Sequence, residues 1–248
     1  MKKLAILIFP VIFLISCQTK QEPSKTEAKP SEEKKEVTLS VNEEKPVPTN
    51  TLRDVRPPSN DMKQASVNFR RGMELVMAQN YKEGIEYFDR ALTSEPNNAR
   101  IYFNRGYAYY SMKDYKNALA DFNSSLKINP SDTMVLLYSG LTKFYTMDFN
   151  GALQDYSEAI KKSKRYATAY FNRGLIRGQM NDYKGAIEDF TQAINFSPDY
   201  SQAYYNRGLA YFYSKDSGNA CMDWIQANKM GSPDAQKAVE AYCEKRKL

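Results

Sequence analysis

The sequence contains no histidine and only three cysteines in 248 residues. Without histidine it cannot build the nucleophile systems that pair serine or cysteine with an imidazole, and it lacks the commonest metal ligand. The three cysteines are too few for a disulfide scaffold, and none of them has the CxxC spacing of a metal site. A glycine-rich phosphate-binding loop is also absent. We therefore predict no catalytic residue, no metal and no cofactor, and disfavour an enzyme.

Charge of one sign is not concentrated anywhere along the chain. The formal net charge is +6, from 35 lysines and arginines against 29 acidic residues. Two of the lysines, Lys2 and Lys3, precede the first hydrophobic run, and without them the balance is 33 − 29 = +4. The remaining basic residues are interspersed with acids, which is typical of a solvated surface. We predict no nucleic-acid partner.

The hydrophobic run at the N-terminus extends from Leu4 to Ile15. It is too short to span a membrane, which takes about 20 residues, but it suits the central region of a secretory signal. One interpretation is a plain signal peptide followed by an incidental cysteine. Alternatively, the stretch Leu14-Ile15-Ser16-Cys17 resembles the lipobox of bacterial lipoproteins.

The lipobox resemblance implies cleavage of residues 1–16 and lipidation of Cys17, with diacylglycerol on its sulfur and an acyl chain on its amino group. Several acyl chains anchor a protein firmly, because each buried methylene contributes roughly 0.8 kcal/mol. Gln18, where some lipoproteins carry aspartate, is similar to lipoproteins sorted to an outer membrane. The expected location is the bacterial cell envelope, at the outer rather than the inner membrane, facing the periplasm or the exterior.

Residues 17–60 are rich in lysine, glutamate, proline, serine and threonine and contain no aromatic residue. Such a composition buries too little apolar area to offset the entropy of ordering, so we predict a disordered tether. Its simplest role is a spacer, although its proline-rich pieces could also be recognised by a partner.

An internal repeat of constant period begins after residue 60. Its most regular column is glycine, and the columns that follow hold a small residue, an aromatic residue, another small residue and, in some repeats, proline. In the second repeat these are Ala118, Phe122, Ser125 and Pro130. The repeated glycines are Gly72, Gly106, Gly140, Gly174 and Gly208. Aligned columns at one period indicate stacked structural units rather than a repeated active site.

Each repeat has the pattern of a helix hairpin. In the second repeat, Tyr102, Gly106 and Tyr109 are spaced as one stripe of a helix, and Asp114 is a good N-cap for the helix that follows. Pro130 then ends the second helix. Gly106 would let the two helices approach closely, and one hairpin alone leaves an apolar face uncovered. The hairpins must therefore stack.

These columns closely resemble the tetratricopeptide repeat (TPR). The resemblance implies an all-α, right-handed superhelical solenoid of five helix hairpins over residues 61–234, followed by a capping helix at 235–248. The repeats would be 65–98, 99–132, 133–166, 167–200 and 201–234. The pattern departs from the family at repeat position 7, which is mostly arginine here but Ser139 in the third repeat. Lys143 and Lys164 also replace the tyrosine and the proline expected in that repeat.

In the TPR family, repeat positions 2, 5, 9, 12 and 13 of the first helix face a concave groove that binds peptides. The resemblance therefore implies a partner-binding surface with an aromatic lining, and asparagines at position 6 that could hold a partner's backbone. A second interpretation, that position 5 is packed inside the fold, is equally open. The candidate partner-binding residues are Phe103, Asn104, Tyr107, Tyr110, Phe144, Phe171, Asn172, Tyr205 and Asn206.

Two other sets of residues have a structural and a functional interpretation. Arginine at position 7 recurs with aspartate at position 23, as in Arg105 and Asp121, and we favour a salt bridge over a ligand contact. Cys221 and Cys243 flank the last predicted turn and would meet between antiparallel helices. In an exported protein we favour a disulfide, with two small buried residues as the alternative.

Together these features predict a lipid-anchored scaffold or adaptor in the bacterial envelope. Its expected partners are proteins or peptide segments of envelope proteins, and the membrane through the lipid on Cys17. The lysine and asparagine with which chaperone-binding TPR domains clamp a C-terminal carboxylate are replaced by Phe103 and Tyr107. The alternative function is a lipoprotein that binds a small molecule or glycan and supports transport.

Overall fold

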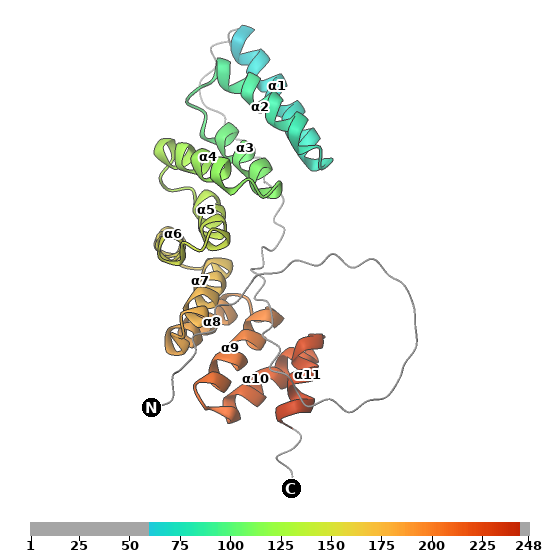
Figure 1. Cartoon of the computed structure of the whole chain (residues 1–248), viewed down its shortest axis with the longest axis vertical. Helices are drawn as coiled ribbons and strands as arrows, with labels where there is room; N and C mark the ends of the chain where they lie inside the picture. The colour runs from blue at the N-terminus through green and yellow to red at the C-terminus, as the bar shows by residue number, and fades with distance from the viewer. Residues whose placement is uncertain (1–59, 244–248) are drawn as a thin grey trace, which may run out of the picture. The chain divides into compact units, whose positions relative to one another are not determined.

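The computed structural model describes residues 60–243, which fold entirely into helices and connecting turns (Figure 1). Cys17, the predicted signal peptide and the predicted tether lie outside the described residues. Within 60–243 there are eleven helices: α1 Asn60–Met77, α2 Tyr81–Ser94, α3 Ala99–Ser111, α4 Tyr115–Ile128, α5 Thr133–Tyr145, α6 Phe149–Lys162, α7 Ala167–Gln179, α8 Tyr183–Phe196, α9 Ser201–Tyr213, α10 Ser217–Lys229 and α11 Pro233–Tyr242. None of these helices is long and apolar enough to cross a membrane.

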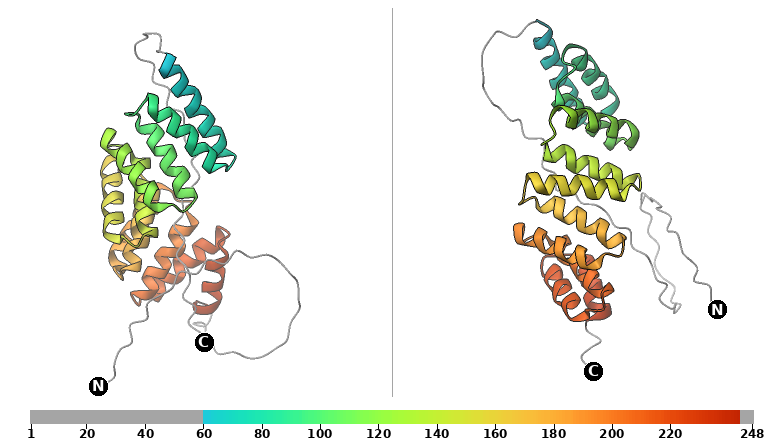
Figure 2. Two further views of the ribbon diagram at one scale, coloured as in Figure 1. Left: turned by 45° about the horizontal axis from the view of Figure 1, so that its top comes forward. Right: turned by 90° about the vertical axis from the view of Figure 1, so that its left-hand side faces the viewer.

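The helices form a stack of hairpins. Helices α1 and α2 pack as one hairpin, and so do the four pairs from α3/α4 to α9/α10. The second helix of each hairpin packs against the first helix of the next, as the successive colours in Figure 2 show. This arrangement confirms the all-α solenoid of helix hairpins predicted from the sequence repeat. We call the first helix of each hairpin its A helix and the second its B helix.

A close approach of the two helices explains the repeated glycine. A Cβ atom added to Gly106 would lie 2.8 Å from Cε1 of Phe122, and one added to Gly140 would lie 2.7 Å from the Tyr156 ring. At Gly208 the corresponding distance to Trp224 is 2.6 Å. All three aromatic rings are buried, so no larger residue fits at the glycine without displacing the core of the hairpin.

The turn within each hairpin is also repeated. In each turn one residue has a positive φ, between 62° and 68°, and none of these residues is glycine. They are Gln79, Lys113, Met147, Asn181 and Lys215. In the second to fifth hairpins an aspartate follows directly and caps the B helix. In the second hairpin, for example, Asp114 accepts a hydrogen bond from the backbone N–H of Asn117. The capping oxygen satisfies a backbone donor that the helix itself leaves unpaired.

The third repeat closes normally although it lacks the expected proline. Helix α6 ends at Lys162 and α7 begins at Ala167, so residues 163–166 form the connection. The connections 95–98, 129–132 and 197–200 have the same length and the same place in the repeat. Lys164 therefore does not change the closing turn.

Helix α11 packs against α10 at the C-terminal end of the stack. Ala235 and Ala238 are buried in this contact, and Pro233 occupies the first turn after the cap residue Ser232. A disulfide joins Cys221 on α10 to Cys243 directly after α11, with 5.6 Å between the two Cα atoms. In the structure the C-terminal helix is thus held to the last hairpin covalently as well as by apolar packing.

Candidate binding surface on the A helices

The densest group of aromatic side chains lies where the second and third hairpins meet. Tyr138 on α5 makes edge-to-face contacts with Phe103, Tyr107 and Tyr110 of α3, with ring centroids 5.7, 5.3 and 5.7 Å apart. Tyr138 is 8% exposed, whereas the three rings of α3 are half-buried. Edge-to-face contacts of this kind contribute about 0.5–1.5 kcal/mol each beyond apolar burial. Tyr138 is therefore the buried centre of a packed aromatic group.

A stacked pair of tyrosines extends this group to the turns of the hairpins. The rings of Tyr115 and Tyr145 are 5.4 Å apart and almost parallel, at 4°. Tyr110 contacts both of them, at 6.0 and 6.1 Å. Burial raises the pKa of Tyr110 and of Tyr115 above the ordinary tyrosine value, so both phenols stay neutral near pH 7. We call Tyr107, Tyr110, Tyr115, Tyr138 and Tyr145 the tyrosine cluster.

A related arrangement occurs two repeats later. Tyr183 and Tyr213 occupy the same repeat positions as Tyr115 and Tyr145, and their rings also stack, 5.5 Å apart at 16°. Phe212 beside them contacts Trp224 at 5.6 Å and Tyr242 of α11 at 4.8 Å. Tyr213 is 60% exposed. This second stack lacks a counterpart of Tyr138, because position 6 of the fifth repeat is Asn206.

Charge is almost absent from the A-helix face, which we define as repeat positions 2, 5, 9, 12 and 13. Of these positions in the five repeats only one, Arg100, holds a charged residue. Its guanidinium lies 5.3 Å from the centre of the Phe69 ring, a cation–π contact. In the second and third repeats these positions hold Arg100, Phe103, Tyr107, Tyr110, Ser111, Met134, Leu137, Leu141, Phe144 and Tyr145. Leu137 and Leu141 are buried in the core, so the other residues form the accessible part of the face.

Two of the predicted partner-binding residues belong to the core instead. Phe171 is 1% exposed and Asn172 is 0% exposed, so neither reaches a partner in this structure. The Phe171 ring packs against Phe190 at 5.7 Å and against Tyr200 at 4.7 Å. Tyr200 occupies the last position of its repeat, where the second repeat has the small Asp132. That difference explains why Phe103, at the same repeat position as Phe171, stays half-buried.

Two of the three predicted asparagines donate hydrogen bonds to their own helix. Asn104 is 6% exposed, and its side-chain N–H donates to the backbone oxygen of Arg100 at 2.7 Å. Asn206 donates in the same way to Gln202 at 2.8 Å. Both amides therefore donate to their own helix, one turn earlier. That they also hold a partner's backbone stays a prediction. The side-chain amide of Asn172 has no hydrogen-bond partner among the described residues.

The other predicted residues remain partly accessible. Phe103, Tyr107, Tyr110 and Phe144 are half-buried, and all four lie on or beside the tyrosine cluster. Tyr205 is also half-buried but lies apart from them, packed against the cluster around Trp224. The candidate site is thus concentrated at the second and third hairpins.

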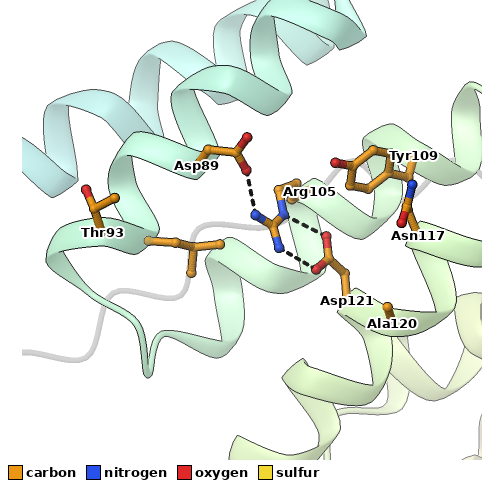
Figure 3. Close-up of a pocket in the computed structure, with 8 residues that line it drawn as sticks. Asp89, Thr93, Arg105, Tyr109, Asn117, Ala120 and Asp121 are labelled. Carbon is orange, nitrogen blue, oxygen red and sulfur yellow. Dashed lines mark hydrogen bonds and ion pairs between the residues drawn. The ribbon is translucent and has the colours of Figure 1, made fainter.

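The predicted arginine–aspartate pairs form in the structure and also join neighbouring hairpins. Arg105 donates from Nε and Nη2 to the two carboxylate oxygens of Asp121, at 2.8 and 2.7 Å, and its Nη1 donates to Asp89 of the preceding hairpin (Figure 3). Asp121 raises the pKa of Arg105 above its usual value. These groups line an open depression of about 540 Å³ with Leu92, Thr93, Tyr109, Asn117 and Ala120. The charges in this depression already pair with one another, which leaves no free charge for a ligand.

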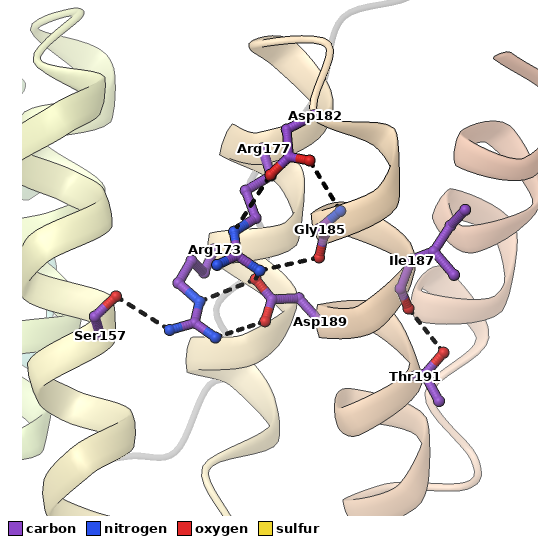
Figure 4. A network of polar contacts seen from close by, with 8 residues as sticks. All are labelled: Ser157, Arg173, Arg177, Asp182, Gly185, Ile187, Asp189 and Thr191. Atoms are coloured by element: carbon purple, nitrogen blue, oxygen red, sulfur yellow. Dashed lines mark hydrogen bonds and ion pairs between the residues drawn. The ribbon is translucent and has the colours of Figure 1, made fainter. Parts of the chain in front are cut away.

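The same arrangement, which we call the polar clamp, occurs at two other junctions between hairpins. Arg173 donates to both carboxylate oxygens of Asp189, at 2.9 and 2.7 Å, and to Ser157 of the preceding hairpin at 3.1 Å (Figure 4). Burial raises the pKa of Asp189, and the hydrogen bonds from Arg173 act in the opposite direction. In the last clamp Arg207 contacts Asp223 and Thr191. The sequence predicted the arginine–aspartate pair within a hairpin but missed the contact between hairpins. In all three cases the residue that the arginine contacts in the preceding hairpin lies at repeat position 25.

The junction of α4 and α5 is the one junction between hairpins in residues 60–243 that lacks this clamp. Ser139 replaces the arginine, and Lys143 supplies the cation instead, with its Nζ 2.7 Å from Asp155. The neighbouring residue in the repeat also changes, because Tyr138 replaces asparagine. At this junction an aromatic group thus takes the place of a polar clamp.

Comparisons with known proteins agree with the repeat assignment. The family model described as "Tetratricopeptide repeat" matches residues 99–132, which is the second predicted repeat. A second model, "TPR repeat", matches residues 179–213. The chain is a TPR solenoid. Proteins built from TPR repeats are generally non-enzymatic scaffolds that bind protein or peptide partners. A comparison of the sequence with curated proteins gives no significant match.

Several solved TPR structures are similar to this solenoid. MamA has 20% identity and a TM-score of 0.64, with 73% of this chain and 96% of that chain covered. MamA from Desulfovibrio magneticus RS-1, residues 41 to the end, has 18% identity and a TM-score of 0.64, with 68% and 95% covered. YrrB, described as a TPR protein with an unusual peptide-binding site, has 20% identity and a TM-score of 0.62, with 71% and 91% covered. At these identities the similarity establishes the fold alone.

Proposed function

We propose that this TPR solenoid is a scaffold whose partners bind to the A-helix face at the tyrosine cluster. One observation carries the proposal: partly exposed aromatic rings gather around the buried Tyr138 at the junction that lacks the polar clamp. Tyrosines held rigidly by their neighbours lose little entropy on binding, and tyrosine is enriched among the residues that dominate binding energy.

The chemistry of the face defines the kind of partner. The face has no acidic residue to balance a buried basic side chain of a ligand, and Arg100 is its single cation for an acidic one. The phenol groups can exchange hydrogen bonds with a peptide backbone, while the rings cover apolar side chains. The proposed ligand is therefore an uncharged, apolar segment of a partner protein.

We further propose that Cys17 anchors this scaffold to the bacterial envelope, at the outer rather than the inner membrane, where its partners would be envelope proteins. The lipobox resemblance at Leu14–Cys17 supports this part of the proposal. The proposed tether, residues 18–60, has 43 residues, and a flexible chain of that length would span roughly 35–40 Å root-mean-square. Cys17→Ala should then abolish labelling by a fatty-acid analogue in cells, and unchanged labelling would refute the anchor.

Site-specific photo-crosslinking in intact cells tests the binding surface. A photoreactive amino acid at Tyr107 should give a defined adduct with a partner, because this half-buried ring lies at the edge of the cluster. The matched control places the same group at Asn123, which is exposed on the B helix α4. Equal adducts from both positions, or adducts from Asn123 alone, would show that partners bind another face.

A further inference from the structure

A ligand for the uncharged A-helix face occurs in the chain's own sequence. Between Cys17 and Asn60 most residues are charged, polar or proline, but the stretch Val37-Thr38-Leu39-Ser40-Val41 is uncharged. Its three aliphatic residues alternate with hydroxyl residues, so an extended conformation places Val37, Leu39 and Val41 on one side. We propose that this segment, residues 37–41, is an intramolecular ligand of the A-helix face at the tyrosine cluster. The inference rests on the binding surface proposed above.

The charges around the segment agree with this assignment. Glu36 precedes it and Glu43 follows it after a single asparagine, so the acidic groups at both ends can stay in solvent while the apolar residues are covered. The other uncharged stretch of comparable length between Cys17 and Asn60, residues 46–52, contains Pro46 and Pro48 and only two aliphatic residues, Val47 and Leu52. Those two are separated by an odd number of positions and lie on opposite sides of an extended chain.

The length of the connection permits this contact. From Val41 to Asn60, where α1 begins, there are 60 − 41 = 19 residues. A flexible chain of that length spans about 25 Å root-mean-square and at most about 65 Å. The A helices α1, α3 and α5 pack in succession, and helix axes in contact lie about 8–10 Å apart. The cluster on α3 and α5 is therefore within reach of the segment.

Intramolecular attachment makes even a weak contact effective. A short flexible connection gives an effective concentration on the order of 1 mM. If a free peptide of the same sequence bound with a dissociation constant of about 0.1 mM, the ratio of bound to unbound attached segment would be about ten to one. An external partner would then have to displace it, so the segment would set a threshold of affinity for partners.

A labelled peptide measures this competition directly. The probe is a fluorescent peptide of residues 34–43, titrated into the purified mature chain and into a variant with Val37→Ser, Leu39→Ser and Val41→Ser. We expect the peptide to bind about tenfold more tightly to the variant, because its own segment no longer competes. The matched control changes three other branched aliphatic residues between Cys17 and Asn60 (Val47→Ser, Leu52→Ser and Val55→Ser) and should bind the peptide as the unmodified chain does.

The remaining outcomes decide the proposal. Equal affinity for all three proteins, or no binding to the variant, would overturn it. Adding Tyr107→Ala to the variant should weaken peptide binding at least tenfold; unchanged binding would place the peptide elsewhere and also overturn it. A dimer that dissociates when residues 37–41 are changed would assign the segment to a second copy instead. Partner adducts from the Tyr107 position are measured independently, so this inference can fail while the proposed binding surface stands.

Discussion

Phe103 and Phe171 occupy the same repeat position but should contribute very differently to stability. Phe171 is 1% exposed between Phe190 and Tyr200, whereas Phe103 is half-buried against Phe122 and Tyr138. Replacing a fully buried phenylalanine by alanine removes its burial energy and leaves a cavity, which together cost about 3–5 kcal/mol. The partly exposed ring loses less on truncation, so Phe103→Ala should cost roughly half as much.

The two variants are compared by thermal unfolding of otherwise identical protein. For a folded region of about 150–250 residues, 1 kcal/mol changes the melting temperature by about 2–4 °C, so Phe171→Ala should lower it by roughly 6–20 °C. Phe103→Ala should lower it by about half that amount and should also reduce partner crosslinking from the tyrosine cluster. If both variants lose the same stability, or Phe103→Ala loses more, then burial does not distinguish these two positions and our assignment of Phe171 to the core is wrong.

Three further predictions concern the scaffold itself. Arg207→Met leaves Asp223 buried without its partner and should lower the free energy of unfolding in urea by about 3–5 kcal/mol. Combining Arg207→Met with Asp223→Leu should recover most of that loss. A double variant no more stable than the single one would contradict the polar clamp. Reducing the disulfide between Cys221 and Cys243 should lower the stability by roughly 3 kcal/mol, and non-reducing peptide mapping that finds both thiols free would refute the pairing. Met147→Gly should raise the free energy of unfolding by about 0.5–1 kcal/mol, because glycine adopts a φ of 64° without strain. A lower melting temperature would show that the Met147 side chain contributes more stability than the backbone strain costs.

The hairpins could be predicted because their cause is local. Gly106 and Phe122 meet within one repeat, and the short stretch of chain between them fixes which faces of the two helices come together. The aspartate at Asp114 caps its helix through the backbone of Asn117, in the first turn. Contacts of these kinds recur from one repeat to the next, so the sequence pattern carried the same information several times over.

The candidate site was harder to predict because it depends on how neighbouring hairpins meet. Tyr138 was not among the predicted residues, yet three other rings pack around it. The exposure of Phe171 depends on Tyr200, the last residue of the same repeat, which no position rule for the first helix takes into account. The available signal for the site was the set of departures at positions 6, 7 and 11 of the third repeat, taken together.

The disulfide makes the two ends of the solenoid unequal. Helix α11 is linked covalently to α10, so the last hairpin cannot lose its covering helix by simple fraying. At the other end, α1 packs against α2 and α3 but has no such link among the described residues. Because each hairpin is stabilised mainly by its neighbours, opening should begin at α1 and proceed toward the C-terminus. Amide hydrogen exchange should therefore be fastest in α1 and α2, and faster exchange in α10 would disprove this polarity.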